Sequence, residues 1–281
     1  MNRIEDALDI LYEDEELALC CERLLPQVEK ILEGLDKSLP PFIDGDFFVE
    51  IVNLVRDKLL SENKEQLEEK MGIVTVTFEL GSGGLELAKK ISEKLGYKLV
   101  FEEILKETAK RLGVPEWKIE EFNEFKYASS KLSFFDMFQL DKDFIDFSAL
   151  LGKESQEITF EKFRETLTKV VVSFAVSNNV VIVGHGSACF LREYPNCLHL
   201  KVEAPFVDRV RTFAQNYNLS LEEAEKQLRK IDEKEKEFYK DMCDADISSI
   251  DLFHLKVNTS KIPVEEAAKL VVDTFKLLVE E

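Results

Sequence analysis

The chain has 281 residues, of which 56 are Asp or Glu and 37 are Lys or Arg, so its formal net charge at pH 7 is −19. Such an acidic surface repels nucleic-acid phosphates and anionic lipid headgroups, and no local basic patch offsets it, so we expect neither nucleic acid nor a membrane as a partner. With 45% hydrophobic residues and 21 Phe, the chain has enough apolar material for one large domain or two smaller ones.

The number and spacing of the cysteines and the sequence of the N-terminus indicate the cellular compartment. There are five cysteines, an odd number; Cys20 and Cys21 are adjacent, and none belongs to a CxxC motif. The N-terminus lacks the basic start and apolar middle of a signal peptide, and the longest stretch without Asp, Glu, Lys, Arg or His, residues 170–184, is too short to cross a bilayer. We therefore expect a soluble, cytoplasmic protein with reduced cysteines.

The first 70 residues differ from the rest of the chain. Apolar residues recur at helical spacing from Leu17 to Leu35, and Pro26 should kink or restart that helix. A second amphipathic helix is predicted from Phe48 to Leu59, before a charged run at residues 62–70. We interpret residues 1–70 as a helical module whose apolar faces pack on each other, on the main domain, or on a second copy or a protein partner.

Residues 71–281 alternate apolar strands with amphipathic helices, which is typical of a parallel sheet covered on both faces. Strands are predicted at residues 73–78, 98–101, 180–183, 198–202 and 252–257, and helices at 85–95, 103–112, 161–177, from 206, 220–240 and 264–278. Residues 116–160 are mixed in pattern and are expected to form an insert. Ligands should bind at the carboxyl ends of the strands.

A glycine-rich loop, Gly81-Ser82-Gly83-Gly84, follows the first of these strands and precedes a helix. This order of elements directs backbone N–H groups and a helix N-terminus at an anion, such as a phosphate. Glycine allows φ > 0 and leaves room for the phosphate oxygens. A tight structural turn uses the same residues, so the loop alone supports both interpretations.

The chain resembles the cytidylate-kinase-like family of P-loop proteins from about residue 72 to its C-terminus. The matching motifs follow the order of the family: residues 78–96 around the glycine loop, 181–188 (Val-Ile-Val-Gly-His-Gly-Ser-Ala), 203–205 with Arg209, 219–225, Ile231-Asp232, Tyr239, 251–252 and 257–259. The resemblance implies an α/β, P-loop kinase-like three-layer fold with a five-stranded parallel sheet. It also implies a substrate-binding insert at residues 116–160 and a lid at about residues 218–250.

The resemblance also implies site residues. Phosphate binding is expected along the glycine loop and the start of its helix, and donor-nucleotide contact at two arginines of a later helix: Gly81, Ser82, Gly83, Gly84, Leu85, Glu86, Arg209 and Arg211. For the two arginines, surface ion pairing to Glu203 or Asp208 is an alternative. Candidate catalytic residues are Lys89, His185 and Asp232.

Three scattered histidines predict no metal site. His185 lies between two glycines at a strand end, where it either contacts a phosphate, the interpretation we favour, or bonds a neighbouring carbonyl. His199 and His254 are expected inside strands, as structural residues.

Departures from the family leave two hypotheses. Four positions where the family carries cations are Phe78, Leu85, His185 and Glu235. One arginine can be worth roughly 10³–10⁵ in phosphoryl transfer, whereas backbone N–H groups can bind phosphate without any charged side chain. The first hypothesis is a nucleoside-monophosphate kinase, by resemblance cytidylate, that uses ATP and Mg²⁺. The second is a catalytically impaired relative that senses a nucleotide or phosphate, or acts as a protein-interaction module.

Overall fold

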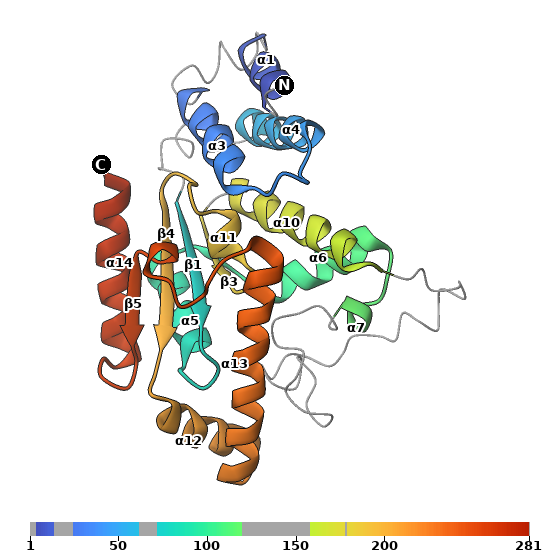
Figure 1. The fold of residues 1–281 in the computed structure, drawn as a ribbon. Helices are drawn as coiled ribbons and strands as arrows, with labels where there is room; N and C mark the ends of the chain where they lie inside the picture. The colour runs from blue at the N-terminus through green and yellow to red at the C-terminus, as the bar shows by residue number, and fades with distance from the viewer. Residues whose placement is uncertain (1–3, 14–24, 62–71, 120–157, 178, 281) are drawn as a thin grey trace.

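The computed structural model describes residues 4–13, 25–61, 72–119, 158–177 and 179–280. A five-stranded sheet with strand order β2-β3-β1-β4-β5 lies at its centre, and every pairing is parallel (Figure 1). The strands are β1 (Ile73–Phe78), β2 (Lys98–Val100), β3 (Val180–Val183), β4 (Cys197–Glu203) and β5 (Leu255–Asn258). The predicted α/β fold class is confirmed.

Strands β1 and β3 are buried along their whole length, which explains their uninterrupted apolar sequences. Val76 of β1 lies opposite Val183 of β3 and Leu200 of β4. This register brings the carboxyl ends of the three central strands together. The glycine loop after β1 and the loop at residues 184–186 after β3 therefore lie at the same edge of the sheet.

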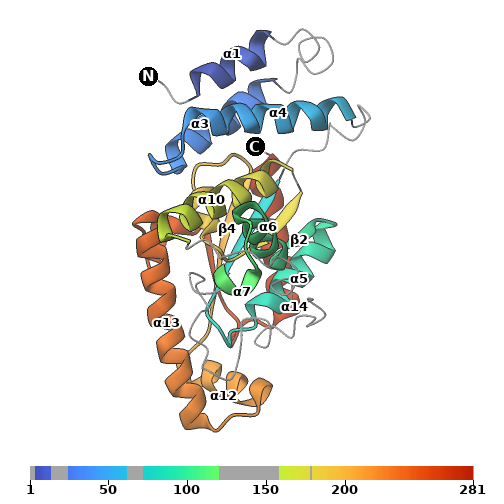
Figure 2. The ribbon, with the colours of Figure 1, turned by 90° about the vertical axis from the view of Figure 1, so that its right-hand side faces the viewer.

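Helices cover both faces of the sheet (Figure 2). Helices α5 (Gly84–Leu95) and α14 (Val264–Glu280) pack against each other on one face. On the other face, α10 (Phe160–Val176) contacts α6 (Glu102–Leu112), and α11 (Ser187–Phe190) contacts β1. The chain thus has the predicted three layers.

The predicted lid region contains most of a long helix, α13 (Leu221–Cys243), which follows α12 (Phe206–Tyr217). Ser220 and Glu223 form a reciprocal capping box that fixes the start of α13. Most of the predicted insert, residues 120–157, lies outside the described residues, and only α7 (Glu116–Ile119) and the three residues at 158–160 represent it.

The last predicted strand begins later than expected. Residues Ile250–Leu252 form a 3₁₀ helix, and β5 starts at Leu255. His254 therefore precedes the strand instead of lying in it, and its Nδ1 accepts a hydrogen bond from the backbone N–H of His199 at 3.1 Å. Apolar alternation alone could not separate this turn from the strand that follows it.

The described residues of the N-terminal module form three helices, which lie at the end of the sheet opposite the glycine loop: α1 (Glu5–Glu13), α3 (Leu25–Ser38) and α4 (Gly45–Ser61) (Figure 1). Helix α1 was not predicted. Pro26 lies in the first turn of α3, as expected of a helix that restarts there. The charged run at residues 62–70 lies outside the described residues.

Polar and close backbone contacts attach the module to the main domain. The backbone N–H of Glu193 donates to Ser38 Oγ at 2.8 Å, and a Cβ at Gly34 would lie 2.2 Å from the Glu193 carbonyl oxygen. In the described part of the module, Tyr12 (54% exposed) and Leu54 (40%) are the large apolar side chains left exposed. The buried apolar residues of the module belong to one cluster with those of the main domain, so the apolar faces pack on each other and on that domain, and a further partner stays a prediction.

The prediction of reduced cysteines is wrong for one pair. Cys189 in α11 and Cys243 at the end of α13 form a disulfide across 54 positions of sequence, because the fold brings these two helix ends together. Cys197 is free and buried, and Cys20 and Cys21 lie outside the described residues. No helix in the described ranges is long and apolar enough to cross a membrane. The cytoplasmic location stays a prediction.

Candidate functional site

The glycine loop opens helix α5 with unused backbone donors. Gly81 and Gly83 have φ of 86° and 77°, in the left-handed region that glycine favours. Gly83 is the N-cap residue of α5 and supplies no side-chain cap. The backbone N–H groups of Gly84, Leu85 and Glu86 have no acceptor within the described chain. Three donors at the positive end of a helix dipole form a site suited to an anion.

The loop has no room for larger side chains. A Cβ at Gly81 would lie 2.7 Å from the carbonyl oxygen of Arg209, and a Cβ at Gly84 would lie 2.1 Å from Cβ of Phe78. Ser82 is buried, and its hydroxyl donates to the carbonyl of Val202 at 3.4 Å. The Ser82 side chain therefore bonds to the sheet, and it is the backbone of this loop that has donors to offer.

A buried arginine connects the glycine loop to helix α13. Arg209 is 3% exposed and donates to both carboxylate oxygens of Asp232, at 3.0 and 2.7 Å. It also donates to the carbonyl of Leu80 at 3.2 Å, and its Nε lies 3.3 Å from Glu79 Oε2. The backbone N–H of Ala204 donates to the same Glu79 oxygen at 3.2 Å. We call Arg209, Asp232, Glu79 and the Leu80 carbonyl the loop brace.

Two of the predicted site residues, Arg209 and Asp232, form an ion pair with each other in the loop brace. Burial alone would lower the pKa of Arg209, but the hydrogen bonds and charge of Asp232, with the charges of Glu79 and Glu235, raise it. Arg209 therefore stays charged and directed at carboxylates, instead of pairing with Glu203 or Asp208 as the alternative interpretation had it. Its geometry is that of a residue that positions the loop.

Arg211, the other predicted arginine, lies on the surface. Its side chain is 69% exposed, and Nη1 is 3.6 Å from Asp208 Oδ1 in the preceding turn of α12. This is the surface ion pair named as the alternative for that residue. Such pairs contribute little to stability.

His185 is buried at the second loop and is bonded to protein. It is 1% exposed, its φ is 57°, and its Nε2 lies 3.1 Å from the carbonyl oxygen of Phe101. Its ring stacks on that of Phe101, with 5.6 Å between centroids. Burial lowers the pKa of His185 to about 4, so the imidazole is neutral at pH 7. The geometry matches the bond to a neighbouring carbonyl, the interpretation we did not favour.

Few cations are available near the glycine loop. Three of the four positions compared with family cations in the sequence analysis carry no positive charge. Phe78 and Leu85 are apolar, and Glu235 is acidic and buried. Lys90 pairs with Glu265 of α14 at 2.9 Å. Lys89 is exposed and has no ion-pair partner within the described ranges.

Several residues that support the loop lie in the family motifs, but sequence analysis gave them no contact with the loop. Thr259 Oγ1 donates to the carbonyl of Ser82 at 2.7 Å, although the two residues are 177 positions apart in the sequence. Thr77, which precedes the end of β1, shares a buried 2.9 Å hydrogen bond with the Tyr239 hydroxyl. Glu79 was aligned with the family motif but was given no structural role. No local pattern signals these pairs, because only the fold brings the partners together.

The comparisons with known proteins agree with this architecture. The model of the family described as "Cytidylate kinase-like family" matches residues 73–261. A protein named cytidylate kinase from Pyrobaculum arsenaticum is 30% identical over 206 residues, which cover 72% of this chain and 92% of that relative. A cytidylate kinase from Pyrobaculum aerophilum is 26% identical over 206 residues, with the same coverage.

A solved structure has the same fold at low sequence identity. The crystal structure of an uncharacterized protein from Eubacterium ventriosum aligns with a TM-score of 0.53 and 15% identity, covering 73% of this chain and 98% of the other. At that identity the likeness speaks for the fold alone. The family match covers most of the main domain, from the first strand to the loop before the last helix. The chain therefore belongs to the cytidylate kinase-like family.

Proposed function

We propose that this protein binds a nucleotide and holds one of its phosphates on the backbone N–H groups at the start of α5. The observation that carries the proposal is the set of three unpaired donors at Gly84, Leu85 and Glu86, behind a loop with two left-handed glycines. Helix N-termini bind phosphate in this way without charged side chains. Because curated relatives are named cytidylate kinase, CMP and dCMP are the first monophosphates to test.

We further propose that phosphoryl transfer from ATP is strongly impaired. Transfer depends on cations around the γ-phosphate, and a single arginine is worth roughly 10³–10⁵ in rate. Here Arg209 is committed to Asp232, His185 is neutral at pH 7, and Leu85 carries no charge. A nucleotide sensor is therefore the function that the site supports best, with a slow kinase as the alternative.

Magnesium would have to arrive with the nucleotide. The described residues contain no group of three or more His, Cys, Asp or Glu side chains that could hold a metal ion. Glu86 stands where a P-loop has its Mg²⁺-binding hydroxyl, and it is exposed. Mg²⁺ commonly binds through substrate phosphates with one or two carboxylates, so the donor set fits a nucleotide-borne ion better than a preformed site.

Thermal unfolding with a nucleotide panel tests the proposal. The panel contains CMP, dCMP, UMP, AMP, ADP and ATP, each with and without Mg²⁺. A ligand at 100 times its Kd stabilises the fold by about 2.7 kcal/mol, which raises Tm by several degrees in a protein of this size. No shift with any of them would overturn nucleotide binding.

A turnover assay on the ligands that shift Tm separates the sensor from the kinase. ATP is mixed with the monophosphate that binds, and ADP release is followed. Kinases of this kind commonly turn over at about 1–100 s⁻¹. A rate in that range would replace the impaired-enzyme proposal with an active kinase, and a rate at least about 10³-fold lower supports the sensor.

A further inference from the structure

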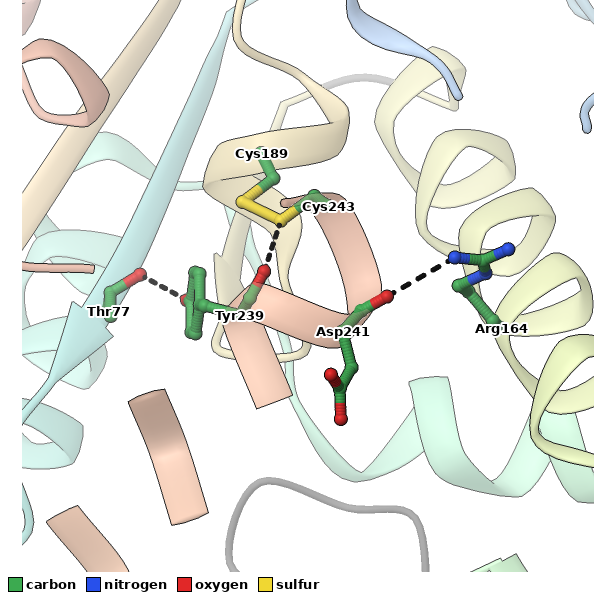
Figure 3. The surroundings of a disulfide bond; sticks show 6 residues. All are labelled: Thr77, Arg164, Cys189, Tyr239, Asp241 and Cys243. Carbon is green, nitrogen blue, oxygen red and sulfur yellow. Dashed lines mark hydrogen bonds between the residues drawn. A yellow bond between two sulfur atoms is a disulfide. The ribbon is translucent and has the colours of Figure 1, made fainter. Parts of the chain in front are cut away.

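A disulfide joins the end of α13 to α11, beside the strand that leads into the glycine loop (Figure 3). The Cα atoms of Cys189 and Cys243 are 6.3 Å apart, a separation that a disulfide spans without moving the backbone. Neither cysteine belongs to the phosphate site proposed above. The link therefore calls for a separate explanation.

Two hydrogen bonds hold the same end of α13. The Tyr239 hydroxyl is 2.9 Å from Thr77 Oγ1 on β1, and Arg164 of α10 donates to the Asp241 carbonyl at 3.2 Å (Figure 3). Further toward its N-terminus, α13 supplies Asp232 to the loop brace. Helix α13 thus connects the glycine loop, β1, α10 and α11, and the disulfide makes the attachment to α11 covalent.

The two cysteines differ in burial. Cys189 is 3% exposed, whereas Cys243 is half-buried at the last turn of α13. Exchange requires a thiolate to reach a disulfide sulfur, so the less buried cysteine, Cys243, is the one that an incoming thiolate should attack. The Tyr239 carbonyl oxygen lies 3.3 Å from that sulfur and would accept a hydrogen bond from a reduced Cys243 thiol. A reduced Cys189 would rest in the core, where a free thiol packs as a small apolar group.

We propose that Cys189 and Cys243 are a reversible thiol–disulfide exchange site that sets how tightly α13 is held against the sheet. In the reducing direction, the thiolate of a small thiol attacks Cys243 Sγ, and Cys189 leaves as a thiolate and takes up a proton. A second small thiolate attacks the small-molecule sulfur of the mixed disulfide, which releases the Cys243 thiol and a small disulfide. The two small thiols supply the two electrons. A small disulfide is the oxidant in the reverse direction.

The exchange has a consequence for the phosphate site, and this consequence rests on the proposed function. Helix α13 carries Asp232, which holds Arg209 against the Leu80 carbonyl at the start of the glycine loop. A looser α13 weakens that brace and changes nucleotide affinity. The exchange itself requires no nucleotide, so the two ideas fail separately.

Hydrogen exchange in buffers of reduced and oxidised glutathione tests the proposal on the full chain. Non-reducing peptide mapping first shows which cysteines are joined at each ratio. We expect a Cys189–Cys243 peptide whose abundance titrates with the ratio, and amide protection in residues 235–243 that falls by about tenfold or more on reduction, as local openings do when an anchor is lost. Protection in α5 serves as the internal reference and should stay constant.

Variants separate the link from its surroundings. Cys243→Ser should resemble the reduced wild-type protein in both redox buffers, while Cys197→Ser, which removes a buried cysteine outside the link, should titrate like wild type. Because reduced wild type is itself a readout, a Cys243→Ser protein that fails to fold does not block the test. The proposal is overturned if Cys189 pairs with Cys20 or Cys21, if no link forms in oxidised glutathione, or if protection is the same in both states.

Discussion

The two glycine loops at the carboxyl edge of the sheet begin alike and end differently. Each follows a buried parallel strand and contains two left-handed glycines, Gly81 and Gly83 in one and Gly184 and Gly186 in the other. The first opens the 12-residue helix α5 and leaves three N–H donors unpaired. The second opens the four-residue α11, where the backbone N–H groups of Ser187 and Cys189 already donate to carbonyls of the loop.

The side chains that support the two loops also differ. The first loop is held from outside by the charged loop brace, which leaves its backbone donors unused. The second is filled by the neutral His185, bonded to Phe101. Similar backbone geometry therefore leaves free donors in one loop, where we propose that a phosphate binds, and supports side-chain packing in the other. The backbone donors of the first loop depend on its glycines and on the start of the helix, and they require no charged side chain.

Removing the charge of the loop brace should give the largest effect. Arg209→Met leaves Asp232 and Glu79 without their buried cation, and breaking a buried ion pair costs about 3–5 kcal/mol. We expect a loss of that size in urea unfolding, together with loss of any nucleotide shift. Arg211→Met is the matched control, because its guanidinium is mostly exposed, and it should change stability by less than about 0.5 kcal/mol. Equal losses for the two variants would show that the brace does not hold the loop.

Acid should destabilise the fold through the second loop. The pKa of His185 is about 4 in the folded protein and near 6.5 in the unfolded chain, so between these values the unfolded state binds more protons. The contribution of neutral His185 to the free energy of unfolding is therefore complete above pH 6.5 and falls as the pH drops toward 4. At pH 4.5 the loss is about 2–3 kcal/mol. His185→Asn tolerates the left-handed backbone and does not titrate.

Urea unfolding at pH 7.5 and 4.5 checks this difference. The Asn variant should lose about 2–3 kcal/mol less than wild type on acidification. The other buried histidine, His199, also has a pKa lowered by burial, to about 3, and it titrates equally in both proteins, so it cancels in the comparison. An identical loss in the two proteins would show that His185 is accessible to protons in the folded state.

A methyl group in the first loop should have a smaller but position-specific cost. In Gly84→Ala the new Cβ would lie 2.1 Å from Phe78 Cβ, which cannot rotate away, so overpacking should cost about 1–3 kcal/mol and displace the N–H donors. Gly96→Ala is the control, because that glycine has φ of 69° and open space around it, with an expected cost of about 1 kcal/mol. Nucleotide shifts should fall in the first variant and persist in the second; persistence in both would place the phosphate elsewhere.

Sequence patterns predicted the parts of this fold that local physics determines. Strands β1 and β3 have apolar runs because both faces of the sheet are covered, and α5 ends where Gly96 adopts the left-handed conformation. The Arg209–Asp232 pair and the disulfide were not predicted, because nothing in the chain near one partner indicates the other. The backbone of the site, a strand followed by a glycine loop and a helix, could thus be predicted from the sequence. The pairing of its charged side chains with each other could not.

Restoring a cation to the first loop is the smallest expected change and the sharpest test of the alignment with the family. Leu85→Arg places a guanidinium in the first turn of α5, where a charge-assisted hydrogen bond to a phosphate is worth about 1.5–3 kcal/mol and the helix dipole opposes it by about 0.3–1 kcal/mol. The net gain is about tenfold in affinity for ATP by titration calorimetry. Leu85→Gln, which is polar and uncharged, separates charge from the loss of the apolar side chain and should leave the affinity near that of wild type. If the Arg and Gln variants bind ATP equally, Leu85 does not face the phosphates, and the cation position of the family lies elsewhere in this loop.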